Sequence, residues 1–153
     1  MNDIIDNIDR RILDELQIDA SRPVDDISEK VGLSRNACWR RIKAMEASGI
    51  IKKRVALVDP DKVGASLTAI VMIKTSTHSA NWIREFQTVL STLPEVVGAH
   101  RMTGDLDYIL RVRLADMPAY DDFYKRLTSR ISVSDMSASF VMEDIKDTTA
   151  VPL

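Results

Sequence analysis

Apolar side chains recur at three- and four-residue intervals through the first third of the chain, which is the spacing of helices that bury one face. Three such sets follow one another: Ile5, Ile8, Ile12 and Leu16; Val24, Ile27 and Val31; and Cys38, Ile42 and Met45. Pro23 suits a helix start and Gly32 a helix end, so both mark breaks between these sets. Ser34 is a good N-cap for the third set and Gly49 closes it. The pattern predicts three short helices, of which the first ends near Ile18 and the third near Ser48.

After Gly49 the pattern becomes extended. The run from Ile50 to Val58 is rich in β-branched and aliphatic residues, and its middle is basic. We expect a strand or wing with a basic rim here. The segment 59–66 holds Pro60 and Gly64 and predicts a linker turn.

From Leu67 onward, strand-like and helix-like patterns alternate. Strands are expected at 67–74, 96–102, 108–114 and 137–142, and helices at 81–93 and through the spacing from Tyr120 to Ile131. The order βαββαβ is that of a ferredoxin-like unit, a four-stranded antiparallel sheet with both helices on one face. The other face then needs a cover, and an identical subunit is the simplest one. The fold class is therefore α+β, with an N-terminal winged helix-turn-helix domain at 1–60 and a second domain at 61–153.

Composition narrows the class of protein. The chain has 153 residues, 45% hydrophobic and 29% charged, with five glycines and five prolines, which is an ordinary globular balance. No apolar run is long enough to cross a membrane, and one cysteine cannot form an internal disulfide, so we expect a soluble cytoplasmic protein. His78 and His100 are too few and too far apart for a convincing metal or catalytic site, and no nucleophile elbow, phosphate-binding loop or zinc-protease motif occurs. We therefore expect no enzyme, no metal and no cofactor.

Charge is segregated along the chain, although the net charge is only −2. Residues 34–54 hold seven basic side chains against the single acidic Glu46. This stretch begins at the N-cap of the third helix, after a tight Val31–Ser34 turn of the kind found in helix-turn-helix motifs. With Cys38, Ile42 and Met45 turned inward, we predict that the outward residues contact DNA: Ser34, Arg35, Asn36, Trp39, Arg40 and Lys43.

Less specific interpretations exist for the same helix. Its outward charges could form an ordinary solvated face, although charge of one sign is unusual there. Trp39 could stack on the second helix or contact a sugar or thymine methyl. Cys38 fits a buried core position better than a redox role.

Two motifs carry a resemblance over almost the whole chain. The first is Val31-Gly32-Leu33-Ser34 followed by Cys38, Arg41-Ile42, Glu46 and Gly49-Ile50-Ile51, and the second is Thr103-Gly104-Asp105-Leu106-Asp107-Tyr108. Together they resemble the Lrp/AsnC feast-or-famine regulators. The resemblance implies a transcription factor with an N-terminal winged helix-turn-helix. Because a dimer carries two recognition helices, we expect it to bind double-stranded DNA at a pseudo-palindromic operator. The resemblance also implies assembly as dimers, tetramers or octamers and binding of a free amino acid where subunits meet.

The loop from Thr103 to Tyr108 has two interpretations. Gly104 and Asp105 are typical of a hairpin turn, whatever the loop binds. Thr103, Asp105 and Asp107 could also hold the ammonium and carboxylate groups of an amino acid. By resemblance the loop is an effector site, with Tyr108, Met117 and Phe140 as further candidates.

The effector itself is expected to be a small, largely uncharged amino acid. Phrases such as Phe123–Leu127 and Ile145–Thr149 resemble a branch of the family whose reported effector is cysteine. Cysteine is therefore the first candidate, with leucine and methionine next. The alternative function is a tetrapyrrole enzyme, since siroheme decarboxylases share this two-part architecture.

Overall fold

The computed structural model describes residues 5–153, which form two compact units. One unit is Met1–Leu57 together with Lys146–Leu153, and the other is Val58–Ile145. The sequence suggested a single boundary near residue 60. In the structure, the last eight residues group with the N-terminal unit instead of the second one.

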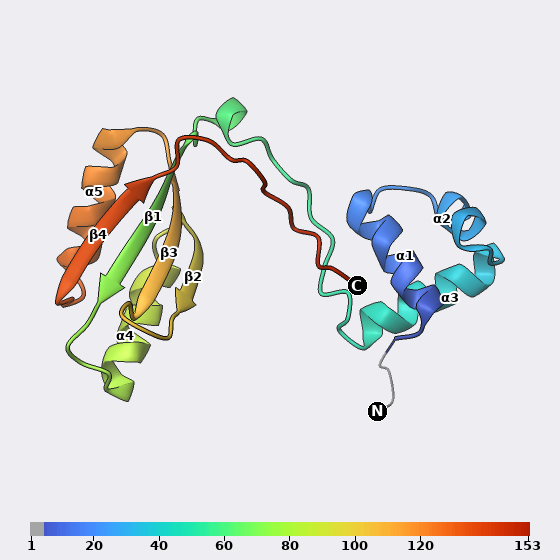
Figure 1. The fold of residues 1–153 in the computed structure, drawn as a ribbon, viewed down its shortest axis with the longest axis horizontal. Coiled ribbons are helices and arrows are strands. Elements are labelled where there is room, and N and C mark those ends of the chain that lie inside the picture. The colour runs from blue at the N-terminus through green and yellow to red at the C-terminus, as the bar shows by residue number, and fades with distance from the viewer. Residues whose placement is uncertain (1–4) are drawn as a thin grey trace. The chain divides into compact units, whose positions relative to one another are not determined.

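The N-terminal unit contains the three predicted helices (Figure 1). Helix α1 spans Asn7–Ile18 and begins with a capping box between Asp6 and Asp9. Helix α2 spans Val24–Val31 and ends at Gly32, which has the left-handed φ of 74° that favours glycine. Helix α3 spans Arg35–Ala47 with Ser34 as its N-cap.

These three helices share one small hydrophobic core. Its buried residues come from every helix: Ile12, Leu13, Ile27, Val31, Cys38, Ile42 and Met45. The apolar spacing in the sequence predicted six of these seven residues, including Cys38, and missed Leu13. The other predicted positions, Ile5, Ile8, Leu16 and Val24, are partly buried against this core. Among the described residues this unit holds no sheet, so the three helices stabilise one another.

The predicted wing strand at Ile50–Val58 does not form. Residues 52–58 are extended and exposed, but no described segment supplies a hydrogen-bonded strand partner. A strand needs a neighbour for its backbone groups, and the β-rich composition alone does not provide one. A short 3₁₀ turn, η1 at Asp61–Val63, follows before the second unit begins its sheet.

The second unit has the predicted βαββαβ order. The strands are β1 (Leu67–Lys74), β2 (Val96–Arg101), β3 (Tyr108–Leu114) and β4 (Asp135–Phe140). They pair antiparallel in the spatial order β2-β3-β1-β4. The helices are α4 (Ala80–Ser91) and α5 (Met117–Thr128). The observed ends lie within two or three residues of the predicted ones.

One face of this sheet is packed and the other is open. Alternate residues of β1, namely Ala69, Val71 and Ile73, are fully buried in a core that also contains Phe86 of α4 and Phe123 of α5. Both helices therefore cover the same face, as the order of elements predicted (Figure 1).

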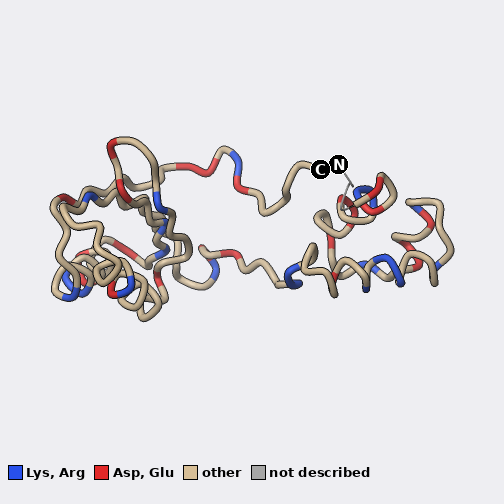
Figure 2. Tube along the Cα trace, turned by 90° about the horizontal axis from the view of Figure 1, so that it is seen from below, with Lys and Arg blue, Asp and Glu red and all other residues tan. Residues whose placement is uncertain are grey.

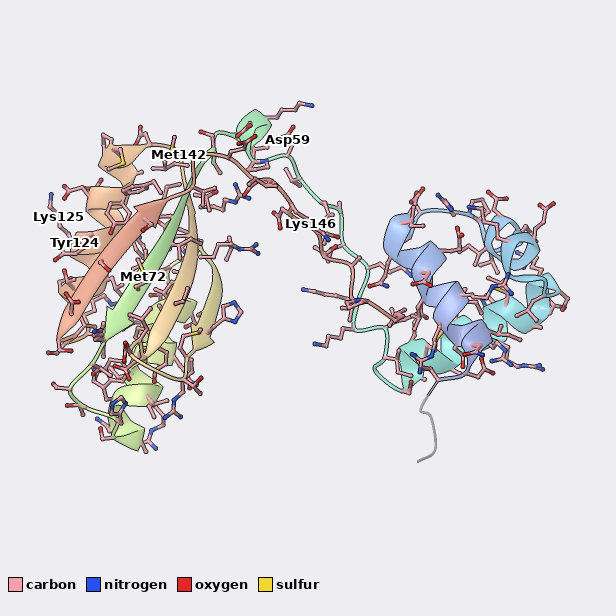
Figure 3. All side chains as sticks on the ribbon, viewed as in Figure 1. Asp59, Met72, Tyr124, Lys125, Met142 and Lys146 are labelled. Carbon is pink, nitrogen blue, oxygen red and sulfur yellow. The ribbon has the colours of Figure 1, made fainter. Side chains whose placement is uncertain are left out.

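The open face has an apolar centre. Met72 pairs with Ile109 across the β1–β3 ladder, and Ile70 lies two residues earlier on β1. All three side chains are half-buried and point away from the helices, because side chains alternate along a strand. Met72 is labelled on this sheet in Figure 3. Among the described residues, no helix is long and apolar enough to cross a membrane.

Candidate DNA-binding and effector sites

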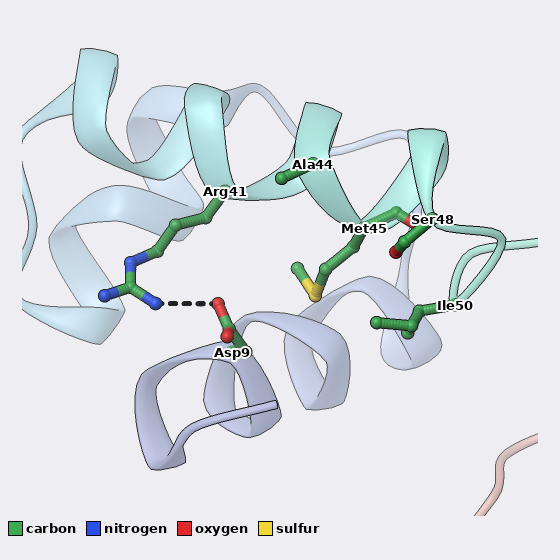
Figure 4. Close-up of a pocket in the computed structure, with 6 residues that line it drawn as sticks. All are labelled: Asp9, Arg41, Ala44, Met45, Ser48 and Ile50. Atoms are coloured by element: carbon green, nitrogen blue, oxygen red, sulfur yellow. Dashed lines mark hydrogen bonds and ion pairs between the residues drawn. The ribbon is translucent and has the colours of Figure 1, made fainter. Parts of the chain in front are cut away.

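Helix α3 is held in place by its inner face. Cys38, Ile42 and Met45 are at most 3% exposed. Beside them, one guanidinium nitrogen of Arg41 donates to Asp6 Oδ2 at 2.7 Å and to Asp9 Oδ1 at 2.9 Å. Figure 4 shows Arg41 reaching from α3 to Asp9 on α1. Arg41 thus holds this side of α3 against α1, so the opposite side of the helix faces solvent.

This ion-pair cluster changes the titration of its members. A backbone hydrogen bond from Asp9 and the hydrogen bond from Arg41 lower the pKa of Asp6. The hydrogen bonds to Asp9 and Asp6 raise the pKa of Arg41. Burial raises the pKa of the Cys38 thiol, which keeps it in the neutral form of a core residue.

The predicted DNA-contact residues lie together on the outer face of α3. Ser34 Oγ accepts a hydrogen bond from the Ala37 N–H at 3.3 Å, so its hydroxyl caps the helix. The side chains of Arg35, Asn36, Arg40 and Lys43 are exposed, and Trp39 is 53% exposed. Figure 2 shows basic residues along α3 and the start of the linker, and acidic residues on α1 and α2.

The cationic charge of this face is smaller than the sequence count suggested. Arg35 Nε lies 3.1 Å from Asp25 Oδ1, and Lys43 Nζ lies 2.7 Å from Glu46 Oε2. Glu46 also pairs with Arg54 at 3.1 Å, so this single carboxylate has two cationic partners but offsets only one positive charge. The count over residues 34–54 left out Asp25 because that residue lies on α2, and it included Glu46 without showing which cations Glu46 contacts.

Three cations of the segment remain available. Arg40, Lys52 and Lys53 are exposed, and none has an ion pair or hydrogen bond with any residue in the range 5–153. Asn36 and Trp39 likewise have no recorded polar partner within that range. The outer face therefore offers a guanidinium, an amide and an indole that are free to meet another molecule.

A pocket of about 310 Å³ lies on the opposite side of α3. Its lining comes from α1, α3 and the turn that follows: Asp9, Arg41, Ala44, Met45, Ser48 and Ile50 (Figure 4). It contains none of the predicted DNA-contact residues. Among the described residues, no cluster of His, Cys, Asp or Glu side chains could hold a metal ion.

The loop between β2 and β3 is an exposed turn with free polar groups. Gly104 has a φ of 101°, a conformation that side-chain-bearing residues rarely adopt, and Thr103 and Asp105 are exposed. The N–H groups of residues 103–106 receive no hydrogen-bond partner from the described chain, and Asp105 has no ion pair there. This arrangement can offer donors to an anion and one carboxylate to a cation.

Asp107 is placed differently from Asp105. Its Oδ2 accepts the Thr75 N–H at 2.8 Å, and its Oδ1 lies 3.6 Å from His78 Nε2. Its backbone N–H donates to Ile73 O at 3.1 Å. The carboxylate therefore already has neighbours on the loop that follows β1.

Tyr108 is buried at the start of β3, directly after the β2–β3 loop. Its ring centroid is 4.8 Å from that of Phe86 and 5.7 Å from that of Trp82, both on α4. Its hydroxyl has no hydrogen-bond partner in the described part of the chain. Tyr108 is thus a core residue of the second unit.

Met117 and Phe140 do not lie near the loop within one chain. Phe140 pairs with Ala69, which pairs with Val112, whereas the loop joins the sheet at Tyr108. Four residues of strand separate Tyr108 from Val112, which is about 13 Å. Met117 is 52% exposed at the start of α5, and Phe140 packs edge-on against Tyr120 at 5.1 Å. The two groups can share a site only if different subunits supply them.

Sequence reasoning missed Arg41, Thr75 and His78. Arg41 was counted as part of the basic segment, although its spacing from Cys38 and Met45 places it beside the inner face. No sequence motif identified Thr75 or His78 as site residues. Their proximity to Asp107 results from the pairing of β1 with β3, which sequence spacing does not reveal.

A helix-turn-helix with a cationic outer face, followed by a βαββαβ domain, defines a two-domain DNA-binding regulator. Residues 5–46 match the AsnC-type helix-turn-helix domain, and residues 68–151 match the Lrp/AsnC ligand binding domain. The chain belongs to the Lrp/AsnC family of transcriptional regulators.

Curated relatives agree over nearly the full length. The chain is 46% identical to the DNA-binding transcriptional activator DecR of Escherichia coli over 151 residues, which cover 98% of this chain and 99% of DecR. It is also 46% identical to the glutamate uptake regulatory protein of Zymomonas mobilis over 149 residues, covering 97% and 91% of the two chains.

Solved structures have the same fold. An AsnC family regulator from Agrobacterium tumefaciens is 50% identical with a TM-score of 0.94, and the match covers 97% of both chains. The regulator NMB0573 from Neisseria meningitidis, in complex with L-Met, is 33% identical with a TM-score of 0.92, over 97% of this chain and 96% of that one.

The Arg41 cluster predicts an acid-sensitive DNA-binding unit. A carboxyl whose pKa is lowered on folding contributes stability at neutral pH, and this stability is lost as the pH falls below about 4. Arg41→Met should therefore lower the unfolding midpoint at pH 7 by about 2–6 °C and flatten its fall between pH 5 and 3. Calorimetry of the full chain measures both effects. Arg40→Met, next along the helix but unpaired, is the control and should change neither; an unchanged acid dependence in Arg41→Met would contradict this role.

Proposed function

We propose that this regulator reads a pseudo-palindromic operator with α3 of two subunits, and that a small amino acid bound at a subunit boundary changes its DNA binding. One observation carries the DNA part of this proposal. The inner face of α3 is locked by Arg41 and the core, and its outer face leaves Asn36, Trp39 and Arg40 without partners among the described residues.

The outer face has the chemistry of major-groove recognition. Arg40 can donate to guanine or to phosphate, and Asn36 can bond an adenine edge. Trp39 adds an apolar surface suited to a sugar or thymine methyl. Lys52 and Lys53, on the extended segment after α3, are placed in sequence to neutralise phosphates. Arg35 and Lys43 must exchange their carboxylate partners for DNA, so we expect a smaller contribution from them.

Arg40→Ala should weaken binding to an operator selected from randomised duplexes. A lost bidentate base contact costs about 1–3 kcal/mol, and a lost phosphate contact reduces the salt slope by about one unit. Fluorescence anisotropy at several salt concentrations measures both quantities. Arg84→Ala, an exposed arginine on α4 of the other unit, is the matched control. Wild-type affinity and slope in Arg40→Ala would refute the recognition-helix assignment.

Assembly follows from the open face of the sheet. Ile70, Met72 and Ile109 form an apolar centre on a face that α4 and α5 leave uncovered. Burying such a face against an identical domain is the simplest way to remove it from water. Two subunits would also bring two α3 helices to half-sites about one helical turn, roughly 10 bp, or a multiple apart.

Met72→Glu should weaken the dimer at least about tenfold, because a carboxylate would be buried without a partner. Light scattering across a concentration series, with circular dichroism to check folding, measures this change. Met142→Glu introduces the same side chain at a fully exposed position and should leave the mass unchanged. An unaltered mass for Met72→Glu at micromolar concentration would exclude this face as the interface.

The effector proposal rests on the loop at residues 103–106. Its unpartnered N–H groups suit a carboxylate, and Asp105 suits an ammonium group, so a free amino acid matches both. The relative in complex with L-Met supports an amino acid of this kind. We propose cysteine, methionine and leucine as the candidates. Met117 and Phe140 of a second subunit could form the apolar wall.

Gly104→Val should lose the response to the effector, because valine rarely adopts a φ of 101° and forcing it costs about 1–3 kcal/mol. A thermal-shift screen of amino acids on the wild-type chain identifies the ligand first. The variant should then raise the ligand's midpoint at least about tenfold while operator binding without ligand stays within about twofold. Gly64→Val, a left-handed glycine outside the loop, controls for strain. A wild-type midpoint in Gly104→Val would mean that the loop is only a turn.

We propose no enzymatic activity for the chain. The curated relatives at 46% identity are transcriptional regulators, which supports this view over the tetrapyrrole-enzyme alternative. Selective operator binding without any spectral response to added siroheme would separate the two functions.

A further inference from the structure

Asp107 joins two loops at one end of the sheet. Its carboxylate accepts the Thr75 N–H at 2.8 Å through one oxygen, and the other oxygen lies 3.6 Å from His78 Nε2. Its own carbonyl accepts the Met102 N–H at 2.8 Å, which closes the 103–106 turn. The β1–α4 loop and the β2–β3 turn are therefore connected through one residue.

The β1–α4 loop is fixed at both ends. Thr75 is buried, and its hydroxyl exchanges hydrogen bonds with the backbone of Thr77 at 3.1 and 3.2 Å. Ser79 caps α4 by accepting the Trp82 N–H at 3.2 Å. His78 lies between these two anchors, so its backbone position is set by the loop and not by the imidazole itself.

The imidazole of His78 is half exposed beside the turn. Its side chain is 51% exposed, and Nε2 is directed at Asp107. The other ring nitrogen, Nδ1, has no recorded hydrogen-bond partner in residues 5–153. An imidazole nitrogen can donate or accept according to its protonation, so Nδ1 suits the charged head group of an amino acid.

We propose that the effector site extends to the β1–α4 loop, with His78 as a ligand-contacting residue and Asp107 as the positioning residue that holds His78 and the 103–106 turn together. This inference rests on the effector site proposed above. In this proposal Asp105 and Asp107 have different roles. Asp105 is exposed and free to meet the ligand's ammonium, whereas Asp107 acts through its neighbours.

The two histidines of the chain allow a direct test. With L-cysteine, L-methionine or L-leucine as the probe, NMR of histidine-labelled full-length protein should show shifts of the His78 ring signals during the titration. His100, on β2, is the built-in reference and should shift less. His78→Ala should raise the probe's midpoint at least about fivefold, while Gln87→Ala, an exposed control on α4, should stay within about twofold.

The positioning role of Asp107 is tested by two variants, the conservative Asp107→Asn and the truncation Asp107→Ala. Asp107→Asn keeps an acceptor for the Thr75 N–H, so the midpoint should stay within about threefold and hydrogen exchange at Thr75 should be unchanged. Asp107→Ala removes the acceptor, so the midpoint should rise at least about tenfold and the Thr75 amide should exchange faster.

Three results would overturn the inference. One is that the His78 ring signals do not shift during the titration and that His78→Ala binds the probe with the wild-type midpoint. Another is an equal loss for Asp107→Asn and Asp107→Ala, which would mean that the charge of Asp107 meets the ligand itself. If no amino acid binds the wild-type chain, the proposed effector function fails as well, and the wild-type titration separates that outcome from the first two.

Discussion

The anchoring of α3 on α1 is the constraint on which the DNA-binding unit depends. Arg41 reaches two carboxylates at the start of α1, and Cys38, Ile42 and Met45 fill the core beside it. A helix has only one inner face, so fixing that face also fixes which side chains point outward. Asn36, Trp39 and Arg40 are outward for this reason. Arg41, which holds the helix, and Arg40, which we propose to contact DNA, are adjacent in sequence and point to opposite sides.

In the second unit, too, burying one face of an element, here a sheet, determines which side chains remain on the other face. Two helices bury one face of β1–β4, and the half-buried Ile70, Met72 and Ile109 remain on the other. The same strand pairing brings the β2–β3 turn next to the β1–α4 loop, where Asp107 ties them together. It also places Phe140 level with Val112, about 13 Å along the sheet from Tyr108, where the turn joins β3. An effector site using both therefore requires a second subunit, which connects ligand binding with assembly.

The sequence predicted the elements that depend on local pattern. Apolar spacing located α1, α2 and α3, and Ser34, Gly32 and Gly49 marked their ends, because caps and left-handed glycines act locally. The alternation after Leu67 predicted the βαββαβ order and the covered face. The wing strand failed because residues 50–58 have strand composition but no partner strand in the described chain, and pairing is not a local property.

Site residues were harder to predict wherever tertiary contacts decide their role. Counting charges over residues 34–54 could not show that Asp25 of α2 pairs with Arg35 or that Glu46 pairs with Arg54, since both pairs depend on the tertiary fold. Asp105 and Asp107 look equivalent in sequence, but only Asp107 lies opposite Thr75. His78 had no motif at all, and only the register of β1 against β3 places it beside the turn.

The central claim is that α3 presents its outer face to DNA, and the tryptophans of the chain offer the most direct measurement. Trp39 is 53% exposed on α3, whereas Trp82 is 7% exposed in the other unit. Fluorine NMR of the 5-fluorotryptophan-labelled protein should give one signal for each. Saturation with the selected operator should shift the Trp39 signal and reduce its solvent exposure, with a much smaller effect on Trp82. A Trp39 signal unchanged by bound operator would contradict the account.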